Sequence, residues 1–193
     1  LRDSAVLRMM HRSVAIYIEE CAEFTHPLPR GSELSGTKVV RCLMGLVVTL
    51  VADLLAIFRH DDLDLSLGLV GPPGAPADRQ TERQEIVQVL HLLLREKEEQ
   101  GTATVEASSG TLLDQVSQVR PEAGRFLTVI AVGRPESVRP LRELRRLPDR
   151  RVLPLAVNAV PGAAAGECEL DLSAAPLNAL RDARRQLLER VVS

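Results

Sequence analysis

The run SVAIYI at residues 13–18 is largely apolar and rich in β-branched side chains, which is typical of a buried strand. Four similar runs follow along the chain: LDLSLGLV at 63–70, ATVEA at 103–107, RFLTVIAV at 125–132 and RVLPLAV at 151–157. Helix-like segments separate the runs, and strands that alternate with helices are the signature of crossover units on a parallel sheet. The sequence therefore predicts an α/β, Rossmann-like fold with a mostly parallel central sheet and helices on both faces.

The spacing of apolar residues predicts helices between these strands. We expect them at residues 38–58, 82–100, 112–119, 136–147 and 175–192, with a weak last strand at 167–172. In the helix at 136–147, Pro140 is placed in the first turn, where a missing N–H is tolerated. Pro154 lies inside the strand at 151–157, which indicates a bulge or a position near an edge of the sheet.

Composition limits the partners that this chain can have. It has 193 residues, a net charge of −2, no Trp, one Tyr and three Phe. A near-neutral, aromatic-poor surface does not attract nucleic acid by charge or by base stacking, so we expect no nucleic-acid partner. We expect one domain over residues 1–193, with a lead-in at 1–12, and because the chain starts at Leu1 we expect it to be part of a longer protein.

The cysteines and the longest apolar segment indicate a cytoplasmic protein without a membrane span. Cys21, Cys42 and Cys168 are odd in number and lack metal-ligand spacing, which favours reduced thiols over disulfides. Residues 39–58 are long enough to span a bilayer, but they contain Arg41 and Asp53, which are costly in lipid. We therefore expect a buried helix in which Asp53 needs a partner, and Arg41 lies too far along the helix to be it.

Three loops that follow strands contain the residues of functional interest. In parallel sheets, ligands meet the loops at the carboxyl ends of the strands. The first strand leads into Glu-Glu-Cys-Ala-Glu at 19–23, the third into Ser-Ser-Gly-Thr at 108–111, and the fourth into Gly-Arg-Pro-Glu-Ser at 133–137. We expect function at the face that these loops form.

In this order, the strands and loops resemble a von Willebrand factor type A domain from about residue 13 to 192. That family has a first strand ending in Asp-x-Ser-x-Ser, a Gly-Thr loop and a later strand ending near Thr-Asp-Gly. The chain is most similar to divergent bacterial members encoded beside MoxR-type ATPases. The resemblance implies a Rossmann-like fold that binds a protein partner through a divalent ion held by oxygen ligands.

Carried over residue by residue, the family's ion-binding motif is degenerate here. Glu19 falls at the first acid, Cys21 at the first serine, Glu23 at the second serine and Thr111 at the loop threonine, while valine and glycine stand at 132 and 133 where Asp-Gly is expected. Cysteine is a poor ligand for magnesium, and valine offers no ligand. The resemblance thus implies a fold whose metal site is lost, with a rebuilt Mg or Mn site of Glu19, Glu23 and Thr111 as the alternative.

Structural roles also account for these residues. Glu19, Glu20 and Glu23 fit solvated loop carboxylates, because a short acidic run usually faces water. Thr111 fits the N-cap of the following helix, and Gly133 fits a chain turn.

We do not expect an enzyme. The chain lacks GxGxxG after a strand, GxxxxGK[ST], GxSxG and HExxH, and the glutamates around Cys21 would raise its thiol pKa and weaken it as a nucleophile. The leading hypothesis is a cofactor-free protein-interaction module in a larger assembly; metal-dependent binding, a reactive Cys21 and a structural scaffold remain as alternatives, and the oligomeric state stays open. The expected partner-binding face consists of Glu19, Glu20, Cys21, Glu23, Ser109, Gly110, Thr111, Gly133 and Arg134.

Overall fold

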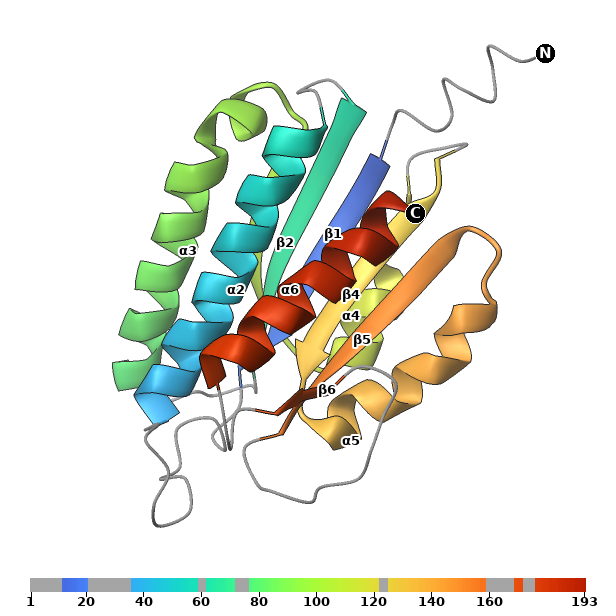
Figure 1. The fold of residues 1–193 in the computed structure, drawn as a ribbon. Coiled ribbons are helices and arrows are strands. Elements are labelled where there is room, and N and C mark those ends of the chain that lie inside the picture. Colours follow the sequence, from blue (N-terminus) through green and yellow to red (C-terminus); the bar gives the residue numbers. More distant parts are fainter. Residues whose placement is uncertain are drawn as a thin grey trace, which may run out of the picture.

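A computed structural model describes residues 12–20, 36–58, 62–71, 77–121, 125–158, 169–171 and 176–193. Their centre is a six-stranded sheet in the order β3-β2-β1-β4-β5-β6 (Figure 1). Every pair of neighbouring strands runs parallel. The strands are β1 (Arg12–Glu19), β2 (Leu63–Gly71), β3 (Ala103–Ser109), β4 (Leu127–Gly133), β5 (Arg150–Asn158) and β6 (Glu169–Asp171). The predicted Rossmann-like α/β fold is confirmed, including the weak last strand.

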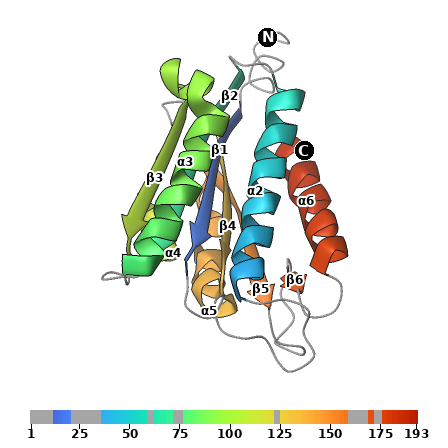
Figure 2. The same cartoon turned by 90° about the vertical axis from the view of Figure 1, so that its left-hand side faces the viewer.

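Helices cover both faces of this sheet (Figure 2). We call the face covered by α2, α3 and α6 the front face, and the face covered by α4, α5 and η3 the rear face. The front helices are α2 (Gly36–Ile57), α3 (Ala77–Glu99) and α6 (Pro176–Val192). The rear elements are α4 (Leu112–Gln118), α5 (Pro135–Val138) and the 3-10 helix η3 (Arg139–Arg146).

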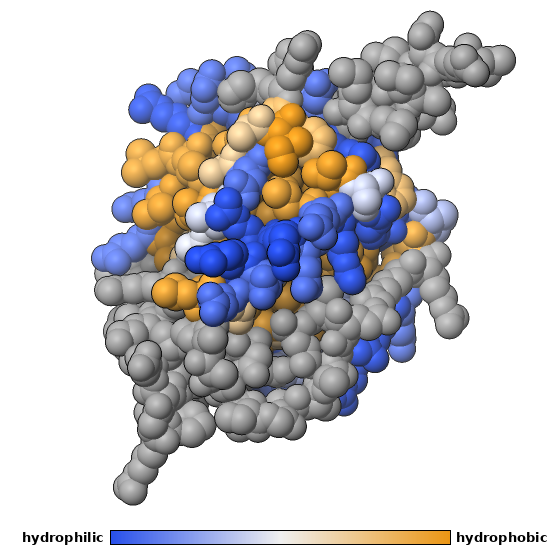
Figure 3. Space-filling model, in the orientation of Figure 1, coloured by the Kyte–Doolittle hydropathy of each residue, from blue (hydrophilic) through white to orange (hydrophobic). Residues whose placement is uncertain are grey.

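The front face holds the larger core. Alternate residues of the strands turn toward it, for example Val14, Ile16 and Ile18 of β1, and they pack against Leu50 and Leu54 of α2. On the outer surface of this layer, hydrophilic residues follow α6, whereas apolar side chains gather over α2 and α3 (Figure 3). Because the side chains buried between the strands and α2 are aliphatic, their burial is the main stabilising contribution on the front face.

The predicted helix at 136–147 is partly wrong. The structure has one α-helical turn over Pro135–Val138 and then a 3-10 helix over Arg139–Arg146. Pro140 explains the change, because it lacks the N–H that an α-helix would bond to the carbonyl four residues earlier, and its ring crowds that carbonyl. Val138 and Leu141 still face the core, at the three-residue spacing that suits a 3-10 helix.

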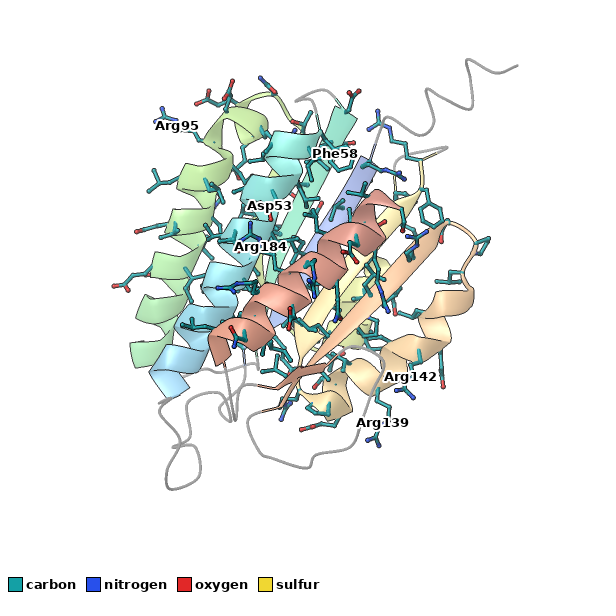
Figure 4. The ribbon with its side chains drawn as sticks, in the orientation of Figure 1. Asp53, Phe58, Arg95, Arg139, Arg142 and Arg184 are labelled. Carbon is teal, nitrogen blue, oxygen red and sulfur yellow. The ribbon has the colours of Figure 1, made fainter. Side chains whose placement is uncertain are left out.

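Asp53 has a partner, as the sequence predicted, and the structure shows that this partner is charged. Arg184 of α6 donates from Nε to Oδ2 of Asp53 over 2.5 Å and from Nη2 to Oδ1 over 2.8 Å (Figure 4). The hydrogen bonds to Asp53 raise the pKa of Arg184, which keeps the pair charged. No helix in the described part of the chain has the length and apolar character to cross a membrane.

Pro154 lies at an edge position, as one of its two interpretations predicted. It pairs with Ala131 of β4 in unbroken register, so there is no bulge. On its other side, the described part of β6 pairs only with residues 156–158 of β5. A proline is tolerated there because no strand in the described part of the chain pairs with residue 154 on that side.

Candidate functional site

The strand order creates a switch point between β1 and β4. The chain builds the sheet outward from β1 through β2 to β3, and then from β4 through β5 to β6. The chain therefore continues from β1 and from β4 to opposite halves of the sheet, and in open α/β sheets ligands bind in the crevice at such a point. Ile18 and Val132 are neighbours in register, so Glu19 and Gly133 end the two strands side by side.

An ion pair joins the two strand ends. Nε of Arg134 donates to Oε1 of Glu19 over 2.7 Å, and Nη1 of Arg134 lies 3.6 Å from Oε1 of Glu136. Glu19 is buried, with 7% of its surface exposed, whereas the Arg134 side chain remains 33% exposed. A carboxylate so far from water needs a charged or hydrogen-bonding partner, and the guanidinium supplies it.

A glycine is needed at position 133 because neighbouring atoms leave no room for a side chain, and not because the chain turns there. Its φ angle is not positive, since the positive-φ glycines of the described chain are Gly101 and Gly110. A Cβ added to Gly133 would lie 2.6 Å from Cδ1 of Leu112 and 3.2 Å from Cβ of Glu19. The interpretation of Gly133 as a turn residue is therefore wrong, and its missing side chain lets α4 approach the switch point.

Thr111 is the N-cap of α4, as its structural interpretation predicted. Its Oγ1 accepts a hydrogen bond from the backbone N–H of Asp114 over 3.1 Å and donates to Oδ2 of Asp114 over 2.7 Å. Gly110 precedes it with a φ of 133°, which favours glycine, and its N–H donates to the carbonyl of Gly71. The cap starts α4 at Leu112, which brings the loop after β3 to Gly133.

Arg150 holds the other end of α4. It is 3% exposed, and its Nη1 donates to the carbonyls of Val116 and Val119, each over 3.0 Å. Its Nε and Nη2 donate to Asp149, and these bonds lower the pKa of that carboxyl. A buried guanidinium thus satisfies carbonyls that a helix end leaves without partners, and it ties α4 to the start of β5.

The structure brings together part of the predicted face. Glu19, Gly133 and Arg134 meet at the switch point, and Leu112 links them to Thr111. Ser109 is the last residue of β3 and Gly110 follows it, and the N–H of Glu20 donates to the carbonyl of Val70 over 2.7 Å. Cys21 and Glu23 lie outside the described residues.

The described residues of this face do not fit a divalent ion. One oxygen of Glu19 accepts from Arg134, and the Thr111 hydroxyl is engaged with Asp114. Gly133 has no side chain, and Val132 has no ligating atom. Among the residues that the structure describes, no group of three or more His, Cys, Asp or Glu side chains is placed to hold a metal ion.

Sequence reasoning missed one residue of this site and one contact. Asp114 closes the Thr111 cap, and the Thr-x-x-Asp spacing of a capping box could have indicated it. Arg134 was placed on the face, but its pairing with Glu19 had no signal in the sequence, because the two residues are 115 positions apart.

Comparison with protein-family models, with curated proteins and with solved structures finds no match for this chain. The geometry of the switch point is therefore the basis on which a function can be proposed.

Proposed function

We propose that this chain is a protein-interaction module of von Willebrand A type that binds its partner without a metal ion. The partner-binding face is formed by the loops after β1, β3 and β4. The observation that supports this proposal is the ion pair between Glu19 and Arg134 at the switch point.

The ion pair provides internally the positive charge that a divalent ion would bring. The Arg134 guanidinium neutralises the buried carboxylate of Glu19 and links the end of β1 to the loop after β4. Such a pair holds the end of β1 and the start of the loop after β4 in one arrangement, so this part of the face is formed before a partner arrives. Binding to a preformed face avoids part of the entropic cost of ordering loops.

Metal dependence is tested first by thermal unfolding in EDTA and then in excess magnesium or manganese. We expect no shift in Tm, whereas a site saturated at a hundredfold above its Kd would add about 2.7 kcal/mol of stability. A clear upward shift that is lost in Glu19→Ala would overturn the metal-free proposal and support the site of Glu19, Glu23 and Thr111.

The face is tested by site-specific photocrosslinking in cells, with the crosslinker at Ser109 or, as a matched exposed position on the front face, at Arg185. We expect one protein to crosslink from Ser109 and not from Arg185. Binding of that purified protein should weaken by about tenfold or more in Arg134→Gln and stay unchanged in Arg185→Gln and in EDTA. Equal crosslinking from both positions would contradict the face, and crosslinks between copies of this chain would instead support a self-assembling scaffold.

A further inference from the structure

A second candidate site lies on the rear face, between α4 and the strands β1, β2 and β3. It is a pocket of about 290 Å³, close to the lower end of the volumes that small-molecule sites occupy. Its lining consists of Tyr17, Ser66, Leu67, Gly68, Thr104, Glu106, Ser108, Gln115, Gln118 and Val119.

The pocket exists because the rear face is incompletely covered. α4 is seven residues long and buries Leu112 and Val116 in the rear core beside β1 and β4. Successive side chains of a strand alternate between faces, so Ser66 of β2 and Thr104 and Glu106 of β3 turn to the rear, beyond the reach of α4. A polar strip of sheet is left open next to the helix.

Tyr17 and Gly68 shape one wall of the pocket. A Cβ on Gly68 would lie 2.4 Å from Cδ1 and 2.6 Å from Cε1 of Tyr17, so the aromatic ring lies directly over the glycine. Burial and the nearby charge of Glu106 raise the pKa of Tyr17, which keeps the phenol protonated at neutral pH. The phenol therefore presents an O–H donor and acceptor beside a carboxylate.

Six polar side chains of the lining have no partner of their own. Within the described part of the chain, none of them makes a hydrogen bond or an ion pair; they are Tyr17, Ser66, Thr104, Glu106, Gln115 and Gln118. Polar groups in folded proteins normally find partners in the protein or in water. Their convergence on one hollow provides donors and acceptors for a bound polar molecule.

The charge of the lining selects the class of ligand. Glu106 carries a full negative charge, and none of the described residues that line the pocket is Lys or Arg. An anion would be repelled, whereas an ammonium or guanidinium group would pair with Glu106 and contact the Tyr17 ring. We propose that this pocket binds a small organic cation, an ammonium or guanidinium group whose remaining polar atoms bond to the surrounding hydroxyls and amides.

Such a group can belong to a free small molecule or to an arginine of a bound peptide. Titrations of the isotopically labelled protein, followed through amide chemical shifts, compare argininamide with citrullinamide, both acetylated at the α-amine. The citrulline compound is then nearly isosteric with the arginine compound but uncharged. We expect shifts at Gly68, Glu106 and Gln115 and an affinity for argininamide at least about tenfold higher. A blocked Gly-Arg-Gly peptide that binds as tightly as argininamide would assign the cation to a peptide, and a peptide that does not bind would assign it to a free molecule.

Glu106→Gln removes the charge at an exposed position and keeps the shape of the side chain. We expect it to weaken argininamide binding by about tenfold or more, with a smaller loss in Tyr17→Phe and no change in Glu143→Gln, an exposed glutamate on η3. Equal shifts with argininamide and citrullinamide, shifts scattered over the surface, or full binding by Glu106→Gln would each overturn the proposal. The result is independent of the proposed protein-binding face, because neither probe nor variant involves the switch point.

Discussion

The two faces of the sheet are built by different means. The front face is covered by helices of 22, 23 and 17 residues, whereas the rear face has elements of seven, four and eight residues. Leu50 and Leu54 anchor the front by aliphatic burial, while the rear helix α4 depends on the polar contacts of Thr111 and Arg150. Both candidate sites adjoin α4, a helix of the layer that has the shorter elements.

The largest effect is expected in the front core. Leu54 is completely buried, so Leu54→Ala should lower the free energy of unfolding by about 2–5 kcal/mol through lost burial and a cavity. Urea denaturation measures this loss. Leu92→Ala, at a side chain 74% exposed on α3, should stay within about 0.5 kcal/mol. A loss at Leu54 no larger than that at Leu92 would contradict the stabilising role of the front face.

Loss of the polar anchor on the rear face should have a smaller and more local effect. Arg150→Met keeps an unbranched apolar stem but leaves the carbonyls of Val116 and Val119 without their donor, at a cost of about 2–3 kcal/mol. Hydrogen exchange should accelerate in α4 before it does in the front helices. The exposed Arg151→Met serves as the control, and equal acceleration in α2 would show that the two faces are not independently stabilised.

Two glycines offer a matched test of opposite sign. Gly133→Ala places a Cβ against Leu112 and Glu19 and should destabilise by about 1–3 kcal/mol. Gly45→Ala, on the exposed side of α2 with nothing within 4 Å, should stabilise by about 0.5–1 kcal/mol because alanine favours the helix. Thermal unfolding measures both variants, and a stabilising Gly133→Ala would contradict the close packing at the switch point.

The smallest effect concerns pH. The hydrogen bond from Arg150 lowers the pKa of Asp149 from its ordinary 3.8, so near that pH the unfolded chain binds more protons than the folded one. The contribution of Asp149 to the free energy of unfolding is therefore present above pH 3.8 and is lost as the pH falls through the lowered pKa. Wild type should exceed Asp149→Asn in stability at about pH 6, with the difference shrinking by about pH 3. A difference that grows on acidification would contradict this sign.

The strands and most helices could be predicted from the sequence, because their patterns are local. Runs such as that at 125–132 are apolar on both faces, as a central parallel strand requires, and Thr111 was recognisable as an N-cap. The helix at 136–147 was predicted with the wrong hydrogen bonding, because an apolar residue every three positions is compatible with both helix types.

The sites depended on contacts between distant parts of the chain. Residues 19 and 134 share no pattern, and the pocket was not predicted, since Tyr17, Ser66 and Glu106 come from three strands. The place of the switch point follows from the strand order, which local periodicity does not contain.

The sequence by itself determined that this chain forms strands and helices in alternation and that Asp53 needs a partner, because periodicity and the cost of burying a charge are properties of single segments. Only the tertiary structure decided that Arg184 is that partner, that Arg134 neutralises Glu19, and that a polar strip beside α4 stays open. These contacts depend on which strands and helices become neighbours in space. The packing of the whole sheet with its helices decides which ones do.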